Sequence, residues 1–352
     1  MSTIKQQLLS HGDFLLITRQ HPDSLEPFTH HLTFDGGRRQ ILMSVLDTGV
    51  ISFEPVDGDT DTDVVLSSAV HGNETAPIEI CQRLIQHIIQ GDLELKQRVL
   101  FLFGNPAAIN IGKRFVEENL NRLFSGAHSD GPGLCNDERI RAKMLEDFVR
   151  DFFDQGGSID SGRTRLHYDL HTAIRGSKND KFAVYPYLHG KPRDKRQLQI
   201  MAACGVNTIL LSESPTTTFS YFSSNEFQAH AFTVELGKVR PFGENDMGNF
   251  VACQQTLYRL LAGQDLALKP FVENDFNLFK IFKTINRETD RFALHFADDA
   301  LNFTDYPLDY LLATDGEKEH RVSAAGEAII FPNAKVAKGQ RALLTVIPTT
   351  LS

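Results

Sequence analysis

Apolar positions along the chain recur with two different spacings. Between residues 64 and 262, short apolar runs alternate with longer segments in which apolar residues recur every three or four positions. The short runs have the length of strands, and the longer segments have the pattern of amphipathic helices. Strands that alternate with helices predict an α/β fold, in which a mixed sheet is flanked by helices.

The predicted elements can be assigned to residue ranges. We expect strands at 64–70, 99–103, 166–170, 208–211 and 232–236, and helices at 76–90, 137–154, 193–204 and 248–262. Before them, two β-prone runs flank Asp35-Gly36-Gly37 and predict a hairpin. After about residue 269 the pattern becomes all-β.

These patterns predict three regions. Residues 1–60 form an N-terminal segment, whose hairpin is a candidate to pack on the C-terminal region and share its strands. Residues 61–265 form the α/β domain, and residues 266–352 form a smaller C-terminal β domain.

Composition narrows the class of protein. The chain has 26 Phe among its 352 residues and is 41% hydrophobic, which indicates a real core. No apolar run reaches the roughly 18 residues that a membrane helix needs, and the first twenty residues lack a signal-peptide pattern. We therefore expect a cytoplasmic protein with no membrane partner.

The net charge of −9 disfavours a general nucleic-acid or anionic-membrane binder, although it permits a local basic pocket. The four cysteines form no CxxC pair, and we expect them to be free, buried thiols. A metal site would therefore depend on His and carboxylate side chains.

The first candidate motif is His71-Gly72-Asn73-Glu74, which directly follows the strand predicted at 64–70. An HxxE at a junction between strand and helix can direct an imidazole and a carboxylate at one ion, because glycine allows a sharp turn. The alternative is a surface turn in which Glu74 interacts with the helix dipole.

A second candidate lies at the end of the strand at 166–170. Alternation places His167, Asp169 and His171 on one face of this strand. A strand-end His far from an HxxE pair is the usual layout of a catalytic zinc with three protein ligands. We expect His171 to be the ligand and Asp169 to orient its ring, while His167, one step further from the strand end, is the competing ligand.

Two further segments carry charged candidates. Glu235 lies near the end of the strand at 232–236, where burial would raise its pKa and suit it to general base catalysis; the alternative is a solvent-facing edge residue. Arg114 and Arg122 lie in the segment GNPAAINIGKR…ENLNR, and could polarise a carbonyl or bind a carboxylate, or be surface charges.

Taken together, the motifs HGNE, GNPAAINIGKR…NLNR, DLHTAIR and TVELGK resemble the zinc carboxypeptidase-like superfamily. The resemblance is closest to its aspartoacylase/succinylglutamate desuccinylase branch and extends from about residue 64 to 250. It implies one zinc ion per chain, with His71, Glu74 and His171 as ligands, and it makes Glu235 the general base and acid. It also implies that Arg114 polarises the carbonyl and that Asn121 and Arg122 bind a substrate carboxylate.

The resemblance further implies hydrolysis of N-succinyl-L-glutamate to succinate and L-glutamate, in arginine catabolism through succinylated intermediates. A small dicarboxylic N-acylamino acid needs a cationic pocket, to which Arg175, Lys238 or Arg240 could also contribute; Arg175 is equally a candidate structural loop residue. The C-terminal β domain is expected to cap this pocket.

Two other functions remain open at this point. One is an N-acetylaspartate or N-acylamino-acid deacylase with the same metal site. The other is a non-catalytic zinc- or anion-binding relative, which the joint presence of Glu235, Arg114 and all three ligands disfavours. The sequence leaves the oligomeric state open, and a homo-oligomer is among the alternatives.

Overall fold

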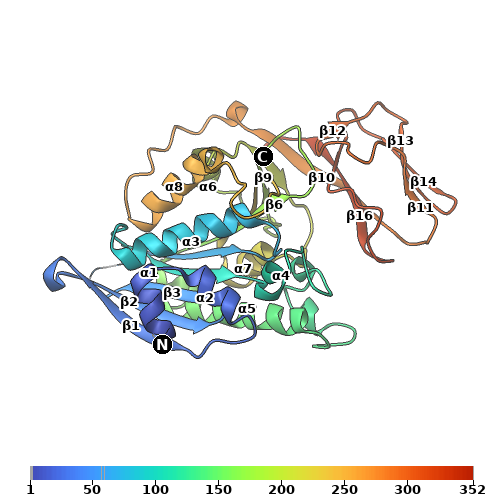
Figure 1. Cartoon of the computed structure of the whole chain (residues 1–352). Coiled ribbons are helices and arrows are strands. Elements are labelled where there is room, and N and C mark those ends of the chain that lie inside the picture. Colours follow the sequence, from blue (N-terminus) through green and yellow to red (C-terminus); the bar gives the residue numbers. More distant parts are fainter. Residues whose placement is uncertain (1–2, 57, 59, 352) are drawn as a thin grey trace.

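The structure is a computed structural model that describes residues 3–56, 58 and 60–351. Within these residues, thirteen strands form one sheet in the order β1-β2-β3-β5-β4-β6-β9-β7-β8-β10-β16-β15-β12, and β11, β13 and β14 form a second, small sheet (Figure 1). In chain order the strands are β1 (Phe28–Phe34), β2 (Arg39–Asp47), β3 (Val50–Pro55), β4 (Thr62–Ser68), β5 (Arg98–Phe103), β6 (Thr164–Ala173), β7 (Phe182–Tyr185), β8 (Thr208–Leu211), β9 (His230–Lys238), β10 (Asn277–Asn286), β11 (Phe292–Leu294), β12 (Thr304–Asp305), β13 (Leu311–Asp315), β14 (Lys318–Arg321), β15 (Ala328–Ile330) and β16 (Arg341–Pro348).

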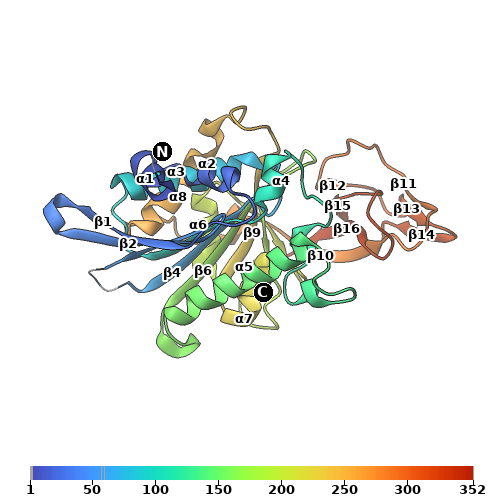
Figure 2. The same ribbon diagram turned by 60° about the horizontal axis from the view of Figure 1, so that its bottom comes forward.

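Helices cover both faces of the main sheet. The α-helices are α1 (Ile4–His11), α2 (Phe14–Gln20), α3 (Thr75–Gln90), α4 (Pro106–Asn110), α5 (Asp137–Gln155), α6 (Lys195–Ala203), α7 (Phe219–Phe227) and α8 (Val251–Leu261). Short 3₁₀ helices occupy Asp35–Gly37, Leu120–Arg122, Ala127–Ser129, Ile159–Ser161, Met247–Phe250 and Glu273–Asp275. Figure 2 shows α1, α2, α3, α6 and α8 on one face and α5 and α7 on the other, and each of these two layers packs on its own cluster of buried apolar side chains. Two further clusters lie in the C-terminal β region and where it joins the sheet.

The centre of the sheet is parallel and apolar. β4 pairs in parallel with β5 and β6, and β6 pairs in parallel with β9. Every residue of β5 is buried, as expected for a strand covered by helices on both faces. The predicted α/β fold with a mixed sheet flanked by helices is therefore confirmed.

The N-terminal segment differs from its expectation. The hairpin of β1 and β2 continues into β3, which pairs with β5, whereas the C-terminal strands extend the opposite edge of the sheet from β8. The expected packing of the hairpin on the C-terminal β region is therefore not found. The pairing of β3 with β5, with Phe53 against Phe101, holds the hairpin at the far edge.

The C-terminal β region is joined to the main sheet, because β10 pairs in parallel with β8 and antiparallel with β16. Figure 1 shows this region, coloured orange to red, extending to one side of the α/β body.

Three of the four cysteines are buried as expected, but Cys135 is exposed. None of the helices in the described ranges has the length and apolarity to span a bilayer.

Candidate active site

The candidate residues gather at the carboxyl ends of three neighbouring parallel strands. His71 and Glu74 follow β4, Asp169 and His171 end β6, and Glu235 lies on β9. The strand register places His171 directly beside Glu235. Because ligands of open α/β sheets bind outside the carboxyl ends of the strands, this edge is where chemistry is expected.

The turn between β4 and α3 depends on Gly72. A Cβ atom at this position would lie 2.2 Å from the carbonyl carbon of Ala108 and 2.3 Å from the backbone nitrogen of Ile109. The Gly72 N–H donates to the carbonyl of Arg114 at 3.1 Å. Glycine therefore lets the HGNE turn pack directly on α4 and on the segment that carries Arg114.

Three buried side chains with metal-ligating atoms converge at this edge. Nδ1 of His71 lies 2.9 Å from Oε1 of Glu74, Nδ1 of His171 lies 2.9 Å from Oε2, and the two Nδ1 atoms are 3.2 Å apart. Ligands of a tetrahedral zinc ion, with bonds of about 2.0–2.1 Å, lie about 3.4 Å from one another. The spacing and the donor set of two imidazoles and one carboxylate therefore fit a zinc ion.

The outer ring nitrogens support the same interpretation. Nε2 of His71 lies 2.9 Å from Oδ1 of Asn119, and Nε2 of His171 lies 2.8 Å from Oδ2 of Asp169. Since an amide oxygen and a carboxylate only accept hydrogen bonds, each Nε2 carries the proton. Both Nδ1 atoms face the point of convergence. Against the effect of burial, Asp169 and Glu74 raise the pKa of His171 well above its ordinary value, so a metal ion bound there would displace its Nδ1 proton.

Electrostatics prepare these groups to bind a cation. Burial, followed by the nearby Arg114, lowers the pKa of His71 to about 4, so its ring is neutral near pH 7. Burial opposes ionisation of Glu74, but His71, His171 and Arg114 together hold its pKa well below the ordinary value. Glu74 is also fixed by the backbone N–H of Thr172, which donates to it at 3.0 Å.

Glu235 faces this cluster without joining it. Its side chain is buried, and its Oε2 atom has no hydrogen-bond partner in the described part of the chain. Burial, with a further contribution from Glu74, raises the pKa of Glu235 to about 7. A carboxylate with a free oxygen and a pKa near neutrality can accept and return a proton.

His167 lies apart from the three ligand atoms. Its Nδ1 is 2.7 Å from Oγ of Ser223, and its Nε2 is 2.8 Å from Oγ of Ser67. Ser67 in turn donates to Oδ1 of Asp169 at 2.6 Å. His167 therefore belongs to a buried chain of hydrogen bonds that reaches His171 through Ser67 and Asp169. The group of convergent ligands consists of His71, Glu74 and His171.

The predicted cationic residues separate into two groups. Arg114 donates from Nη1 to Oε1 of Glu74 at 2.6 Å and so belongs to the site. Arg122 donates to the carbonyl of Asn121, and the buried Asn121 amide oxygen accepts from the backbone N–H of Phe219. The positive charges of Arg341 and Arg114, together with burial, hold the pKa of Arg122 well below its ordinary value, so these arginines lie near one another.

Arg175 is directed toward the C-terminal β region, where its Nη1 donates to the carbonyl of Ala300 at 2.9 Å. This contact gives Arg175 a structural partner, and its proposed role in substrate binding stays a prediction. Lys238 and Arg240 are exposed. The backbone carbonyl of Arg240 accepts from Thr75, at the start of α3.

Sequence reasoning missed two groups that support the site. One is Asn119, the hydrogen-bond partner of His71. The other is Glu138 in the first turn of α5, whose buried carboxylate accepts from the three consecutive backbone N–H groups of residues 116–118 at 2.6–2.8 Å. Glu138 also accepts from the side chain of Asn105, at the end of β5. It therefore fixes the segment that carries Arg114 and Asn119.

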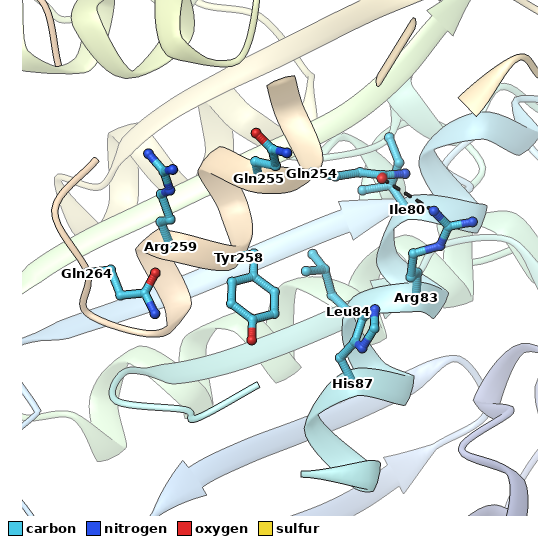
Figure 3. Close-up of a pocket in the computed structure, with 9 residues that line it drawn as sticks. All are labelled: Ile80, Arg83, Leu84, His87, Gln254, Gln255, Tyr258, Arg259 and Gln264. Atoms are coloured by element: carbon cyan, nitrogen blue, oxygen red, sulfur yellow. Dashed lines mark hydrogen bonds between the residues drawn. The ribbon is translucent and has the colours of Figure 1, made fainter. Parts of the chain in front are cut away.

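A separate groove of about 420 Å³ lies between α3 and α8 (Figure 3). Tyr258 of α8 faces Leu84 and His87 of α3 there, and Arg83 donates to Gln254. None of the convergent ligands lines this groove, so it is distinct from the site at the strand ends.

Comparison with known proteins identifies similar chains over nearly the whole length of this one. The profile of the succinylglutamate desuccinylase/aspartoacylase catalytic domain matches residues 60–261, and that of the AstE/AspA barrel-sandwich hybrid domain matches residues 274–349. The chain is 52% identical to the succinylglutamate desuccinylase of Idiomarina loihiensis over 336 residues, which cover 96% of each protein. It is 51% identical to that of Shewanella amazonensis over 336 residues, covering 96% of this chain and 95% of the relative.

A solved structure of the Vibrio parahaemolyticus succinylglutamate desuccinylase has a TM-score of 0.83 and 33% identity, covering 95% of this chain and 94% of that one. The sequence match, the shared architecture and the arrangement of HGNE, DLH and VEL at neighbouring strand ends agree with one another. The chain belongs to the succinylglutamate desuccinylase/aspartoacylase family.

Proposed function

We propose that this protein is a zinc-dependent amide hydrolase that converts N-succinyl-L-glutamate and water to succinate and L-glutamate. The observation that carries the proposal is the convergence of two Nδ1 atoms and a carboxylate beside Glu235, a buried acid with a free oxygen. The choice of substrate is supported by relatives about half identical to this chain over nearly its whole length, which are named for that activity.

His71, Glu74 and His171 would hold one zinc ion per chain. When bound, this ion would act as a Lewis acid toward the amide carbonyl and toward water. Two imidazoles and one carboxylate are the ligand set of many catalytic zinc sites, which keep a further position open.

Glu235 would move the proton. It accepts a proton from the attacking water, for which its raised pKa makes it a sufficient base, and it holds that proton while the carbonyl carbon becomes tetrahedral. It then delivers the proton to the amide nitrogen as the C–N bond breaks, so that glutamate leaves as an amine. The position of Glu235 beside His171 across the sheet suits both steps.

The arginines would stabilise negative charge, both on the carbonyl oxygen during the reaction and on the carboxylates of the substrate. Arg114, held against Glu74, would stabilise the negative charge that develops on the carbonyl oxygen. Arg122, with Asn121, would bind a substrate carboxylate, for which a guanidinium offers two parallel donors. Asp169 and Asn119 would keep the two imidazoles oriented through their Nε2 protons.

The substrate implies a cellular context. A dicarboxylic N-acylamino acid is the product of acyl transfer to an amine, so the proposed place of this enzyme is late in arginine catabolism through succinylated intermediates, in the cytoplasm. Neither a nucleic acid nor a membrane is a proposed partner.

Product identification tests this proposal. Incubation of the zinc-loaded protein with N-succinyl-L-glutamate should yield succinate and L-glutamate in equal amounts, resolved by proton NMR. The same incubation with an E235Q variant controls for spontaneous hydrolysis and contaminating enzymes. Unchanged substrate after prolonged incubation with excess protein would contradict the proposed function.

A further inference from the structure

The C-terminal β region brings one more arginine to the candidate active site. Arg341 begins β16, and its guanidinium carbon lies 5.6 Å from the centre of the Phe331 ring. Phe331 packs against Phe182 with ring centres 5.6 Å apart, and the register of β7 with β9 places Phe182 beside Glu235. A short series of contacts therefore connects Arg341 to the strand that carries the candidate base.

The same region docks on the loop that follows His171. The backbone N–H of Asn302 donates to the carbonyl of Gly176 at 2.9 Å, and the N–H of Lys178 donates to the carbonyl of Asn302 at 3.0 Å. Arg175 adds its bond to Ala300. These contacts fix the C-terminal β region against the edge of the sheet where the ligands converge.

Among the residues that the structure describes, no carboxylate forms an ion pair with Arg341. Its Nε atom is buried without a hydrogen-bond partner among the described residues. Burial and the charge of Arg114 lower its pKa to about 10, and Arg341 is itself the strongest influence on the lowered pKa of Arg122. The charged side chains that act on Arg122 and Arg341, within the described ranges, are arginines and include no carboxylate.

Like charges held close together in a partly buried place repel one another unless a counter-ion joins them. Arg122 and Arg341 are only partly exposed and an arginine keeps its proton under ordinary conditions, so an anion bound between them would offset their repulsion. The planar guanidinium fork matches a carboxylate in particular.

We propose that Arg341 binds one of the three carboxylates of N-succinyl-L-glutamate together with Arg122, so that the anion subsite is built from both domains. This inference rests on the proposed function for the identity of the substrate. It also assigns a role to the C-terminal β region, which supplies a substrate-binding residue as well as covering the site.

The test compares R341M with the wild-type enzyme on N-succinylglutamate and on three analogues that each lack one carboxylate. These are N-succinyl-4-aminobutyrate, N-succinyl-2-aminobutyrate and N-butyrylglutamate. Loss of a charge-assisted hydrogen bond should lower kcat/KM on N-succinylglutamate by about 10- to 100-fold. On the analogue that lacks the carboxylate bound by Arg341 and Arg122, the kcat/KM of R341M and of R122M should be close to that of the wild type.

Two variants control for structure. R321M removes an arginine of β14 that is paired with Glu319, and it should leave kcat/KM unchanged. R341K keeps the positive charge but loses the planar pair of donors of the guanidinium group. Its kcat/KM should therefore lie between those of R341M and the wild type, a partial recovery that a purely structural role would not require. If R341M does not fold, as judged by its thermal unfolding, the comparison of R341K with the wild type on the four substrates replaces it.

The outcomes separate this inference from the proposed function. Equal loss on all four substrates, or no loss on any, overturns the role of Arg341. Calorimetric titration with succinate and with L-glutamate provides a readout without turnover, in which R341M should weaken binding of one product about tenfold or more. A wild type that binds these anions through Arg341 but hydrolyses nothing would retain the subsite and refute the proposed function.

Discussion

Glu235 is the residue on which the proposed chemistry depends most. Its buried carboxylate has a free oxygen and a pKa raised to about 7, and it is not one of the convergent ligands. E235Q keeps the shape of the side chain but removes the base. We expect it to bind zinc normally and to lose turnover by about 10²- to 10⁴-fold.

Zinc content by atomic absorption and amine release from N-succinylglutamate together check this prediction. Full turnover by E235Q would assign proton transfer to another group. Loss of zinc along with activity would make Glu235 a ligand, in conflict with the geometry.

The two histidines of β6 provide a matched pair of substitutions. His171 directs Nδ1 at Glu74, whereas both ring nitrogens of His167 are occupied by Ser67 and Ser223. H171Q should therefore release zinc, and H167Q should retain it while lowering the melting temperature, because a buried hydrogen-bond chain is broken. Equilibrium dialysis against zinc, followed by metal analysis, compares the two, and the reverse pattern would reassign the ligand.

The metal-ligand candidates lie next to strand ends, where sequence motifs are easiest to recognise. Spacing alone left alternatives open for His71, Glu74 and His171; the resemblance of their motifs to a known family selected them, and the structure brings the three side chains together. Asn119 and Arg341 were not recognised, because their contacts depend on the path of a long loop and on the docking of a region more than 200 residues away. Arg175 was ambiguous for the same reason: the sequence does not indicate that Ala300 lies opposite its side chain.

At the scale of elements, the start of α5 controls the loop that carries Arg114 and Asn119. Glu138 satisfies three successive backbone N–H groups of this loop, whereas its neighbour Asp137 is exposed. E138Q should keep the fold but loosen the loop, and we expect kcat/KM to fall by about 10-fold or more, since a charged acceptor of several hydrogen bonds is lost.

D137N is the matched control, because it removes a carboxylate from the same helical turn without touching the loop. Steady-state kinetics and circular dichroism measure both variants. Equal effects of the two substitutions would indicate a general loss of helix-dipole stabilisation instead of a specific role for Glu138.

The packing of the HGNE turn on α4 gives a prediction for stability. G72A would place a methyl group 2.2 Å from the backbone of Ala108, so the two elements must separate. Overpacking costs about 1–3 kcal/mol in many proteins, and here backbone atoms cannot yield by changing rotamer. G248A, whose added methyl group would meet only the tip of Asp246, should be near neutral.

Chemical denaturation measures the free energy of unfolding of both glycine variants. A stability of G72A equal to that of the wild type would show that α4 moves away at no cost. The prediction would then be wrong.

Periodicity identified the long elements well. The helices at α3 and α5 and the central strands matched their predicted ranges to within a few residues, because their apolar spacing is regular over many positions. The short elements α1, α2, β7 and α7 were not predicted. α1 is stabilised by a capping box between Thr3 and Gln6, and β7 has only four residues, too few for a period to be read.

At the scale of the whole molecule, sequence could not place the two β regions. A hairpin and a C-terminal set of strands have similar alternation, and nothing in that pattern states which edge of a sheet each will join. The structure separates them at opposite ends of one sheet, with the C-terminal strands at the edge nearer the candidate base. This arrangement also reconciles a net charge of −9 with the proposed anionic substrate, because Arg114, Arg122 and Arg341 provide locally the positive charge that the whole chain lacks.

The most direct test of the central claim is amine release from N-succinylglutamate, N-acetylaspartate and N-acetylglutamate, measured side by side with and without a chelator. The account predicts strong preference for N-succinylglutamate, loss of turnover on chelation, and recovery when zinc is restored. Preference for an acetylated substrate would retain the metal site but contradict the proposed substrate. Turnover that persists after complete removal of metal would contradict the account as a whole.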